Sequence, residues 1–248
     1  MKILEVKTLT KYFGGVAALR DVSFDVPEKL ICGFIGPNGA GKTTLFSVIT
    51  GAFRPSSGRV ELRGSDITGL HSAALVKKGV ARTHQIVRPF PALTVLENVQ
   101  LAVHYGRRCV ARTSDAREHA MEALKMVGLD SRARQLASAL SLGEQKRLEL
   151  ARALATAPGL LLLDEICGGL TAAETKIMLN LLQTIRQSGT TIMYVEHDMK
   201  AIMSICDRIT VLNFGQKLAE GKPEEIQNDP SVIEAYLGRA TLEGTSRA

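Results

Sequence analysis

The residues best suited to chemistry in this sequence are residues 36–44, which read GPNGAGKTT. The segment matches G-x-x-x-x-G-K-[ST], in which glycines let the backbone wrap closely and aim its amide N–H groups at phosphate oxygens. The Lys42 ammonium would then meet the β- and γ-phosphates of a nucleotide, and the Thr43 hydroxyl would ligate Mg²⁺. We call residues 36–44 the phosphate loop. Its residues predicted to hold the nucleotide are Gly36, Pro37, Asn38, Gly39, Ala40, Gly41, Lys42, Thr43 and Thr44.

Two acidic residues, Asp164 and Glu165, follow the apolar run Leu160 to Leu163. The run predicts a central strand, and an open α/β sheet binds its ligands at the C-terminal edge of such strands. Adjacent strand residues point to opposite faces, so the two carboxylates need not share a role. Asp164 is predicted to hold Mg²⁺ through water, and Glu165 to act as general base on a water aimed at the γ-phosphate. Two solvated acids at a strand end are the alternative, which the nearby phosphate loop disfavours.

His197 lies just past another expected strand, Thr190 to Val195. That position places it at the same sheet edge as the acidic pair, where it would hydrogen-bond the γ-phosphate or fix the attacking water. An isolated histidine is more often structural, but a place directly after a parallel strand favours the catalytic interpretation.

The elements that position these groups alternate between short apolar strands and helical patterns, which predicts an α/β fold with a parallel or mixed sheet. Residues 30–35 read as a buried strand that stops at Gly36, and a helix follows from Thr43. Thr171 begins a TAAE capping box that opens another helix. We predict one domain over residues 1–248. Its α/β core comprises residues 1–86 and 157–248, and a helical subdomain comprises residues 87–156.

The composition is that of a globular protein, with 45% apolar and 23% charged residues among 248. No apolar run approaches the roughly 20 residues of a membrane-spanning helix, and no secretory signal is recognised. The protein is therefore expected in the cytosol unless a partner holds it at a membrane. The four cysteines are scattered, which favours reduced thiols over zinc or disulfides. The net charge of +6 is interpreted as a solvated basic surface, and no nucleic-acid partner is predicted.

Residues 139–154, ALSLGEQKRLELARAL, narrow the function. Residues 141–145, SLGEQ, resemble the signature motif of ABC ATPases, usually LSGGQ, and lie shortly before the acidic strand. With the phosphate loop and the acidic pair, nearly the whole chain is similar to an ABC nucleotide-binding domain. The resemblance implies ATP hydrolysis by a P-loop NTPase of ABC type. Such a fold has a RecA-like mixed sheet core, an N-terminal antiparallel β subdomain and an inserted α-helical subdomain.

The same resemblance implies further site residues. Phe13, in TKYFGG, matches the aromatic residue that stacks on adenine, and Gln85 matches the glutamine that meets Mg²⁺ and senses the transmembrane partner. Ser141, Gly143 and Glu144 would bind the γ-phosphate held by the opposite subunit. Members of the family sandwich two ATP molecules between two domains, head to tail. A two-fold dimer would thus give each phosphate loop a signature motif from its neighbour.

Three segments indicate a subfamily: RTHQIVRPFPALTVLENV, EHDMKAIM and VIEAYLG resemble the ATPases of branched-chain amino acid importers. This implies a second ATPase subunit, either a paralogue or a copy, and two membrane permeases. A periplasmic solute-binding protein would act indirectly, and the chain would sit at the cytoplasmic face of the inner membrane. The nearest alternative is the ATPase of lipopolysaccharide export. ABC ATPases of DNA repair or translation are disfavoured, because no sustained heptads and no second ATPase domain are found.

The sequence departs from the general family pattern near the acidic pair. Ile166 replaces the proline that usually follows the pair, and Thr171 stands where many members have aspartate. In the family the loop between them couples the two ATP sites, so equal hydrolysis at both sites is not implied. Leu142 and Glu144 also alter the middle of the signature motif, whose serine and glycine remain.

Overall fold

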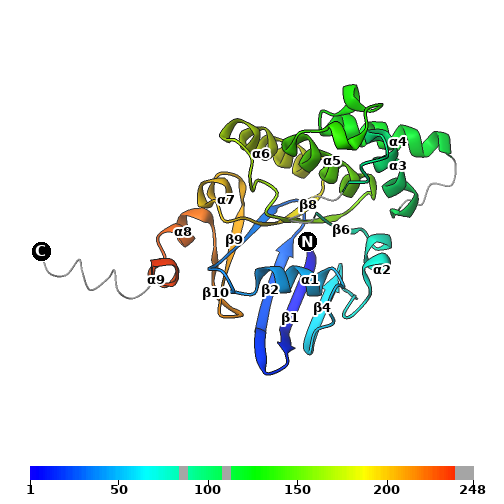
Figure 1. Cartoon of the computed structure of the whole chain (residues 1–248). Coiled ribbons are helices and arrows are strands. Elements are labelled where there is room, and N and C mark those ends of the chain that lie inside the picture. Colours follow the sequence, from blue (N-terminus) through cyan, green and yellow to red (C-terminus); the bar gives the residue numbers. More distant parts are fainter. Residues whose placement is uncertain (84–88, 108–112, 238–248) are drawn as a thin grey trace, which may run out of the picture. The chain divides into compact units, whose positions relative to one another are not determined.

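A computed structural model describes residues 1–83, 89–107 and 113–237 of the chain (Figure 1). The chain divides into two compact units. Unit 1 comprises Met1–Leu70 and Met193–Ala248, and unit 2 comprises His71–Ile192. The strand β8 (Thr191–Val195) runs across the division.

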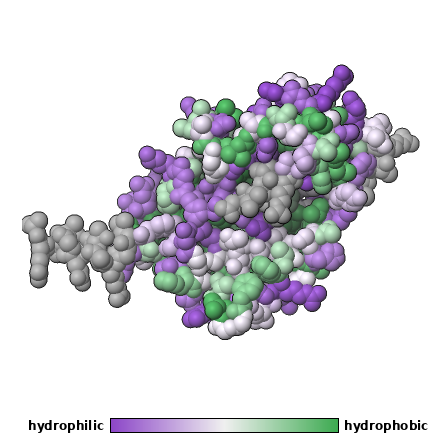
Figure 2. Space-filling view, viewed as in Figure 1, coloured by the Kyte–Doolittle hydropathy of each residue, from purple (hydrophilic) through white to green (hydrophobic). Residues whose placement is uncertain are grey.

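Unit 1 begins with an antiparallel sheet in which β1, β2 and β4 lie side by side (Figure 1). The sheet order is β2-β1-β4-β5, with β1 Lys2–Phe13, β2 Val16–Pro27, β4 Ser57–Leu62 and β5 Ser65–Asp66. Gly14, at φ 57°, opens the two-residue turn between β1 and β2, as tight hairpins require. Phe13 and Val16 flank the turn and are exposed. Figure 2 shows hydrophobic surface at the lower end of the view, where this hairpin turns.

The rest of unit 1 carries the phosphate loop. In its mixed sheet β3 pairs in parallel with β9, and β9 pairs antiparallel with β10. The bounds are β3 Ile31–Ile35, α1 Lys42–Ile49, α7 Met199–Ile205, β9 Arg208–Asn213, β10 Gln216–Gly221, α8 Pro223–Gln227 and α9 Pro230–Leu237. Every residue of β3 is buried, as its apolar run predicts. Phe34 on β3 contacts Phe24 of β2 and Phe46 of α1 at ring-centroid distances of 5.0 and 6.0 Å. These contacts fix β3 and α1, the two elements that flank the loop.

Unit 2 contains a parallel pair of strands and a group of helices. Its elements are α2 Ser72–Lys77, β6 Val80–Arg82, α3 Val95–Tyr105, α4 Thr113–Met126, α5 Leu142–Ala155, β7 Leu160–Asp164 and α6 Ala172–Gln187, with short 3-10 turns at Asp130–Arg132 and Ala137–Ala139. β6 pairs with β7, and α3, α4 and α5 pack against one another. The helices α3, α5 and α6 each begin with a complete capping box, at Thr94, Ser141 and Thr171. The box predicted at Thr171 is therefore confirmed.

The helices α3, α4 and α5 all fall within residues 87–156, the range predicted for the helical subdomain, whose boundaries remain a prediction. Cys32, Cys167 and Cys206 are buried, and Cys109 lies outside the described residues. Burial raises the pKa of Cys32 to about 12. Within the described ranges, no helix combines the length and the apolar character needed to cross a bilayer.

Candidate functional site

The phosphate loop of unit 1 connects β3 to α1 and depends on its glycines. Gly36, Gly39 and Gly41 have φ values of 151°, 80° and 100°, in the region that favours glycine. A Cβ on Gly36 would collide with the carbonyl oxygen of Leu212. A Cβ on Gly41 would lie 2.6 Å from the Ala18 oxygen. The loop can therefore adopt this path only with glycine at those two positions.

Two C-terminal segments of unit 1 support the loop from outside. In the turn between β9 and β10, Gly215 donates its N–H to the Ala40 oxygen at 3.1 Å. From α9, the Tyr236 hydroxyl accepts a hydrogen bond from the Gly36 N–H, while burial raises the pKa of Tyr236. A cavity of about 570 Å³ lies between the loop and these segments, with Phe214 and Glu234 in its lining. The C-terminal part of unit 1 thus helps to shape the loop.

Inside the loop, Lys42 is 6% exposed. Its ammonium donates to the carbonyl oxygens of Gly36 at 2.6 Å and Pro37 at 3.0 Å. The helix α1 begins at this lysine, its Gly41 N-cap receives no side-chain hydrogen bond, and its first turn contains no acid. Backbone N–H groups and the positive end of the helix dipole are therefore available to an anion, beside a buried cation. This combination fits the phosphates of a nucleotide.

Two other predicted site residues lie in unit 1. Phe13 is 43% exposed, contacts the Phe53 ring edge-on at 5.2 Å, and has the Lys11 ammonium 5.0 Å from its ring centre. His197 is exposed and follows β8, as predicted. Its backbone N–H donates to the Glu196 carboxylate at 3.3 Å. Stacking on adenine by Phe13 and contact of His197 with the γ-phosphate remain predictions.

The acidic pair lies in unit 2, at the end of β7. Asp164 is the last strand residue, and its carboxylate accepts a hydrogen bond from Arg82 at 2.7 Å in a partly buried ion pair. Glu165 lies beyond the strand with a left-handed backbone, at φ 51°. Strand alternation therefore does not fix the direction of the Glu165 side chain, since the strand ends one residue earlier. A non-glycine residue at this φ is strained, and such strain is concentrated at functional sites.

The signature residues open α5, also in unit 2. The Ser141 Oγ accepts the Glu144 N–H at 3.4 Å, and the Glu144 carboxylate accepts the Ser141 N–H at 2.9 Å. The Ser141 N–H, followed by nearby Arg132, lowers the pKa of Glu144. A Cβ on Gly143 would lie 2.5 Å from a carboxylate oxygen of Glu174, the acid of the α6 capping box. Ser141, Gly143 and Glu144 therefore lie close together. These contacts are all within the chain, whereas the predicted contact is with the γ-phosphate of another subunit.

Sequence reasoning missed two cations, the half-buried Arg82 and the buried Lys146. Arg82 stands beside Leu162 in the parallel register of β6 and β7, two residues before its partner Asp164. Lys146 is 5% exposed and donates from α5 to the Glu165 backbone oxygen at 3.2 Å. It therefore ties the helix that carries the signature residues to the strained glutamate. A lysine five residues after Ser141, on a helix expected to pack, was the available signal.

The predicted residues are divided between the two units. Unit 1 holds the phosphate loop, Phe13 and His197, whereas unit 2 holds Asp164, Glu165 and the signature residues. Gln85 lies outside the described residues. The functional roles of all these side chains remain predictions.

Comparison with known proteins identifies the family. The profile described as "ABC transporter" matches residues 19–168, and the profile "Branched-chain amino acid ATP-binding cassette transporter" matches residues 216–241. This chain belongs to the ABC transporter family. It is 43% identical to the high-affinity branched-chain amino acid transport ATP-binding protein LivG of Salmonella typhimurium, over 96% of this chain and 98% of that protein. It is 42% identical to BraF of Pseudomonas aeruginosa, with the same coverage.

Solved structures confirm the predicted fold. A nucleotide-free ATP-binding cassette of an ABC transporter superposes with a TM-score of 0.86, at 32% identity over 96% of this chain and 100% of that one. A dimeric bacterial ABC transporter cassette superposes with a TM-score of 0.79, at 30% identity over 89% of this chain and 98% of that one. Together with the family match, these likenesses establish an ABC-type ATPase that binds nucleotide and hydrolyses ATP to drive transport.

Proposed function

We propose that this chain is the ATP-hydrolysing subunit of an importer for branched-chain or related amino acids. The observation that carries the proposal is the identity of 41–43% with LivG and BraF proteins over 96% of the chain. The C-terminal profile match adds to it, since residues 216–241 lie outside the general ABC match. The transported solute would be chosen by partner proteins, because none of the predicted roles of this chain involves contact with it.

Binding of ATP would begin at the phosphate loop. The Lys42 ammonium would exchange the carbonyl oxygens of Gly36 and Pro37 for oxygens of the β- and γ-phosphates, to which it can make stronger, charge-assisted bonds. The backbone N–H groups at the start of α1 would bind the same phosphates. Phe13 would stack on the adenine.

Hydrolysis would follow when a water attacks the γ-phosphorus. Glu165 takes a proton from that water on its carboxylate, the new P–O bond forms, and the bond to the ADP oxygen breaks. His197 would orient the water or hydrogen-bond the γ-phosphate. The Thr43 hydroxyl, the Asp164 carboxylate and the Gln85 amide are oxygen ligands of the kind that Mg²⁺ prefers. When bound there, Mg²⁺ would neutralise phosphate charge.

The working unit would be a head-to-tail pair of ATPase subunits, with a paralogue or a second copy as the partner. The proposal draws support from solved dimeric cassettes, one of them with ADP and Pi bound. Ser141, Gly143 and Glu144 of one subunit would reach the γ-phosphate held by the other. The pair would couple to two permeases at the cytoplasmic face of the inner membrane, with a periplasmic binding protein delivering the solute.

Replacing Glu165 tests the enzymatic half of the proposal. In Glu165→Gln we expect ATP hydrolysis to fall by about 10²–10⁴-fold, because the general base is lost. ATP binding, measured with a fluorescent analogue, should stay within about twofold of the parent. Glu118→Gln, an exposed position on α4, is the matched control and should hydrolyse ATP normally. Hydrolysis by Glu165→Gln at the parent rate would show that this glutamate is not the base.

Transport tests the other half. We expect membranes containing the cognate permeases, this chain and its paired ATPase to accumulate labelled leucine, isoleucine or valine in the presence of ATP and the binding protein. Titrating that binding protein with amino acids, amides and urea would define the solute. A binding protein that recognises none of the branched-chain amino acids would restrict the proposal to the ATPase activity.

A further inference from the structure

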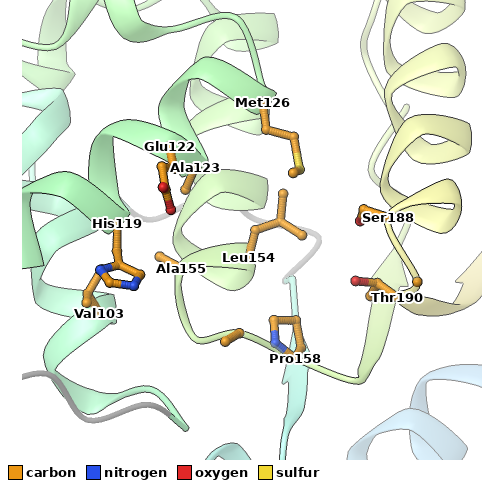
Figure 3. A pocket seen from close by; sticks show the side chains of 12 residues that line it. Val103, His119, Glu122, Ala123, Met126, Leu154, Ala155, Pro158, Ser188 and Thr190 are labelled. Carbon is orange, nitrogen blue, oxygen red and sulfur yellow. The ribbon is translucent and has the colours of Figure 1, made fainter.

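A pocket of about 330 Å³ lies in unit 2, and none of the residues assigned to the nucleotide lines it (Figure 3). We call it the α4–α5 pocket, because those helices supply half of its lining residues. Its lining residues are Val103, His119, Glu122, Ala123, Met126, Leu154, Ala155, Ala157, Pro158, Ser188, Gly189 and Thr190. A volume of this size lies within the range of small-molecule sites.

The polar groups of the pocket lie at its two ends. Figure 3 shows His119 and Glu122 on one side, Ser188 and Thr190 on the other, and Leu154 and Met126 between them. A ligand that spans the pocket would therefore meet an apolar middle between two hydrogen-bonding ends.

The end formed by His119 and Glu122 accepts hydrogen bonds. The Nδ1 atom of His119 lies 2.8 Å from the Asp115 carbonyl oxygen, which can only accept. In the neutral ring Nδ1 must therefore carry the proton, and Nε2 is an acceptor. The Glu122 carboxylate is a second acceptor, and within the described ranges it makes no hydrogen bond or ion pair. Two acceptors three residues apart on one helix lie on the same face of it and suit a group with several N–H donors.

The charge of the pocket favours the same ligand group. Glu122 is the one carboxylate of the lining, and neither lysine nor arginine occurs among the described residues that form it. An anion would find no full positive charge there, whereas an ammonium group would find a charge-assisted partner.

We propose that the α4–α5 pocket binds a small molecule whose primary ammonium group meets Glu122 and His119 and whose apolar chain lies on Leu154 and Met126. Free hydrophobic amino acids and simple alkylamines share this chemistry. They differ at the far end, where the Thr190 hydroxyl can donate to a carboxylate but has no role for an alkylamine. The site shares no lining residue with the predicted nucleotide site, and the binding claim does not depend on which solute the transporter carries.

An NMR chemical-shift titration of the isotope-labelled full-length chain tests the proposal. It uses three probes with similar branched apolar chains and different charged groups. We expect saturable binding of 3-methylbutylamine and of leucine, with dissociation constants on the order of 1 mM, and shifts confined to the pocket. The carboxylate 4-methylpentanoate should bind at least about tenfold more weakly. Equal binding of all three probes, or no saturable shifts at concentrations about tenfold above 1 mM, would overturn the proposal.

Two variants test whether the ammonium group of the ligand contacts Glu122. Glu122→Gln should weaken 3-methylbutylamine about tenfold, since it removes a charge-assisted hydrogen bond. Glu118→Gln, on the same helix but outside the pocket lining, changes net charge equally and should have no effect. Equal weakening by both variants would reduce the interaction to general charge attraction and contradict the site.

A third variant separates the two sources of ligand. Thr190→Val should weaken leucine but not 3-methylbutylamine if the site is shaped for an amino acid. If both ligands bind Thr190→Val as they bind the parent, the ammonium site stands and its ligand is an alkylamine.

Discussion

The N-termini of α1 and α5 are both predicted to meet phosphate, yet the chain builds them differently. At α1 the N-cap is Gly41, no side-chain hydrogen bond reaches it, and the first residue is the buried Lys42. At α5 the N-cap is Ser141, and a complete capping box with Glu144 satisfies the backbone. One helix end offers open donors and a cation, whereas the other carries its own carboxylate.

The difference indicates two kinds of phosphate contact. Open N–H groups at α1 gain hydrogen bonds whenever a phosphate arrives, so the phosphate loop should bind nucleotide in a single subunit. At α5 a phosphate must displace or share bonds that already exist within the capping box, and it meets a negative charge. The net gain per contact is therefore smaller. A weak contact of this kind would suit the proposed subunit interface, which we expect to open again after each hydrolysis step.

The largest effect is expected at α1. Lys42→Ala removes the buried cation, and we expect ATP hydrolysis to fall by at least about 10²-fold, the usual loss for one preorganised donor. Nucleotide affinity of the isolated chain should fall as well, because this contact is made within one subunit. Lys78→Ala, at the exposed C-cap of α2, is the control and should leave both quantities unchanged. Unchanged nucleotide affinity in Lys42→Ala would remove the distinction between the two helix ends.

Ser141→Ala tests the N-terminus of α5 in the same way. Loss of the N-cap should cost about 1 kcal/mol of stability, and loss of a neutral hydrogen bond to phosphate should slow hydrolysis by up to about tenfold. Thr94→Ala breaks an identical capping box on α3 and is the matched control, with a similar stability loss and normal hydrolysis. Unfolding in urea and steady-state ATPase assays measure both. If Thr94→Ala slows hydrolysis as much, the effect of Ser141 is one of stability alone.

The local structure at these helix ends could largely be predicted from the sequence, but the charged contacts around them could not. The phosphate loop and its flanking elements could be read from residues 36–44, since the glycine spacing admits few backbone paths. The capping box at Thr171 could also be predicted from the sequence. The box at Ser141 was missed because a family motif covers the same residues and directs attention to phosphate. The ion pair of Arg82 with Asp164 depends on strand register, which local sequence does not specify.

Neutralising the α5 carboxylate should produce a smaller change, in the opposite direction. Glu144→Gln keeps an oxygen for the Ser141 N–H but removes a negative charge from the helix end that is predicted to meet phosphate. A charge of this kind is worth about 0.3–1 kcal/mol, so ATP-driven dimerisation should strengthen by roughly two- to fivefold. Analytical ultracentrifugation measures this dimerisation when the variant is made in a chain that cannot hydrolyse ATP. Glu97→Gln, the same change in the α3 box, should leave dimerisation unaltered.

The smallest expected effect is a loss of stability at low pH, when the carboxylates of the capping boxes are protonated. Backbone N–H donors of the capping boxes lower the pKa values of Glu97, Glu144 and Glu174 below 4.5, and Thr94, Ser141 and Thr171 supply those donors. A carboxyl group whose pKa is lower in the folded state stabilises the fold above its unfolded pKa, and that stabilisation disappears as the pH falls through the folded pKa.

We therefore expect the melting temperature to decline as the pH is lowered below about 4.5. The decline should be shallower in the triple variant Glu97→Gln, Glu144→Gln, Glu174→Gln. The helix α1 has no acid in its first turn, so its N-terminus should lose no such contribution. Calorimetry from pH 3 to 7 on both proteins measures the difference in slope. Parallel curves would mean that the capping carboxylates add nothing to stability, and that α5 is as open to an anion as α1.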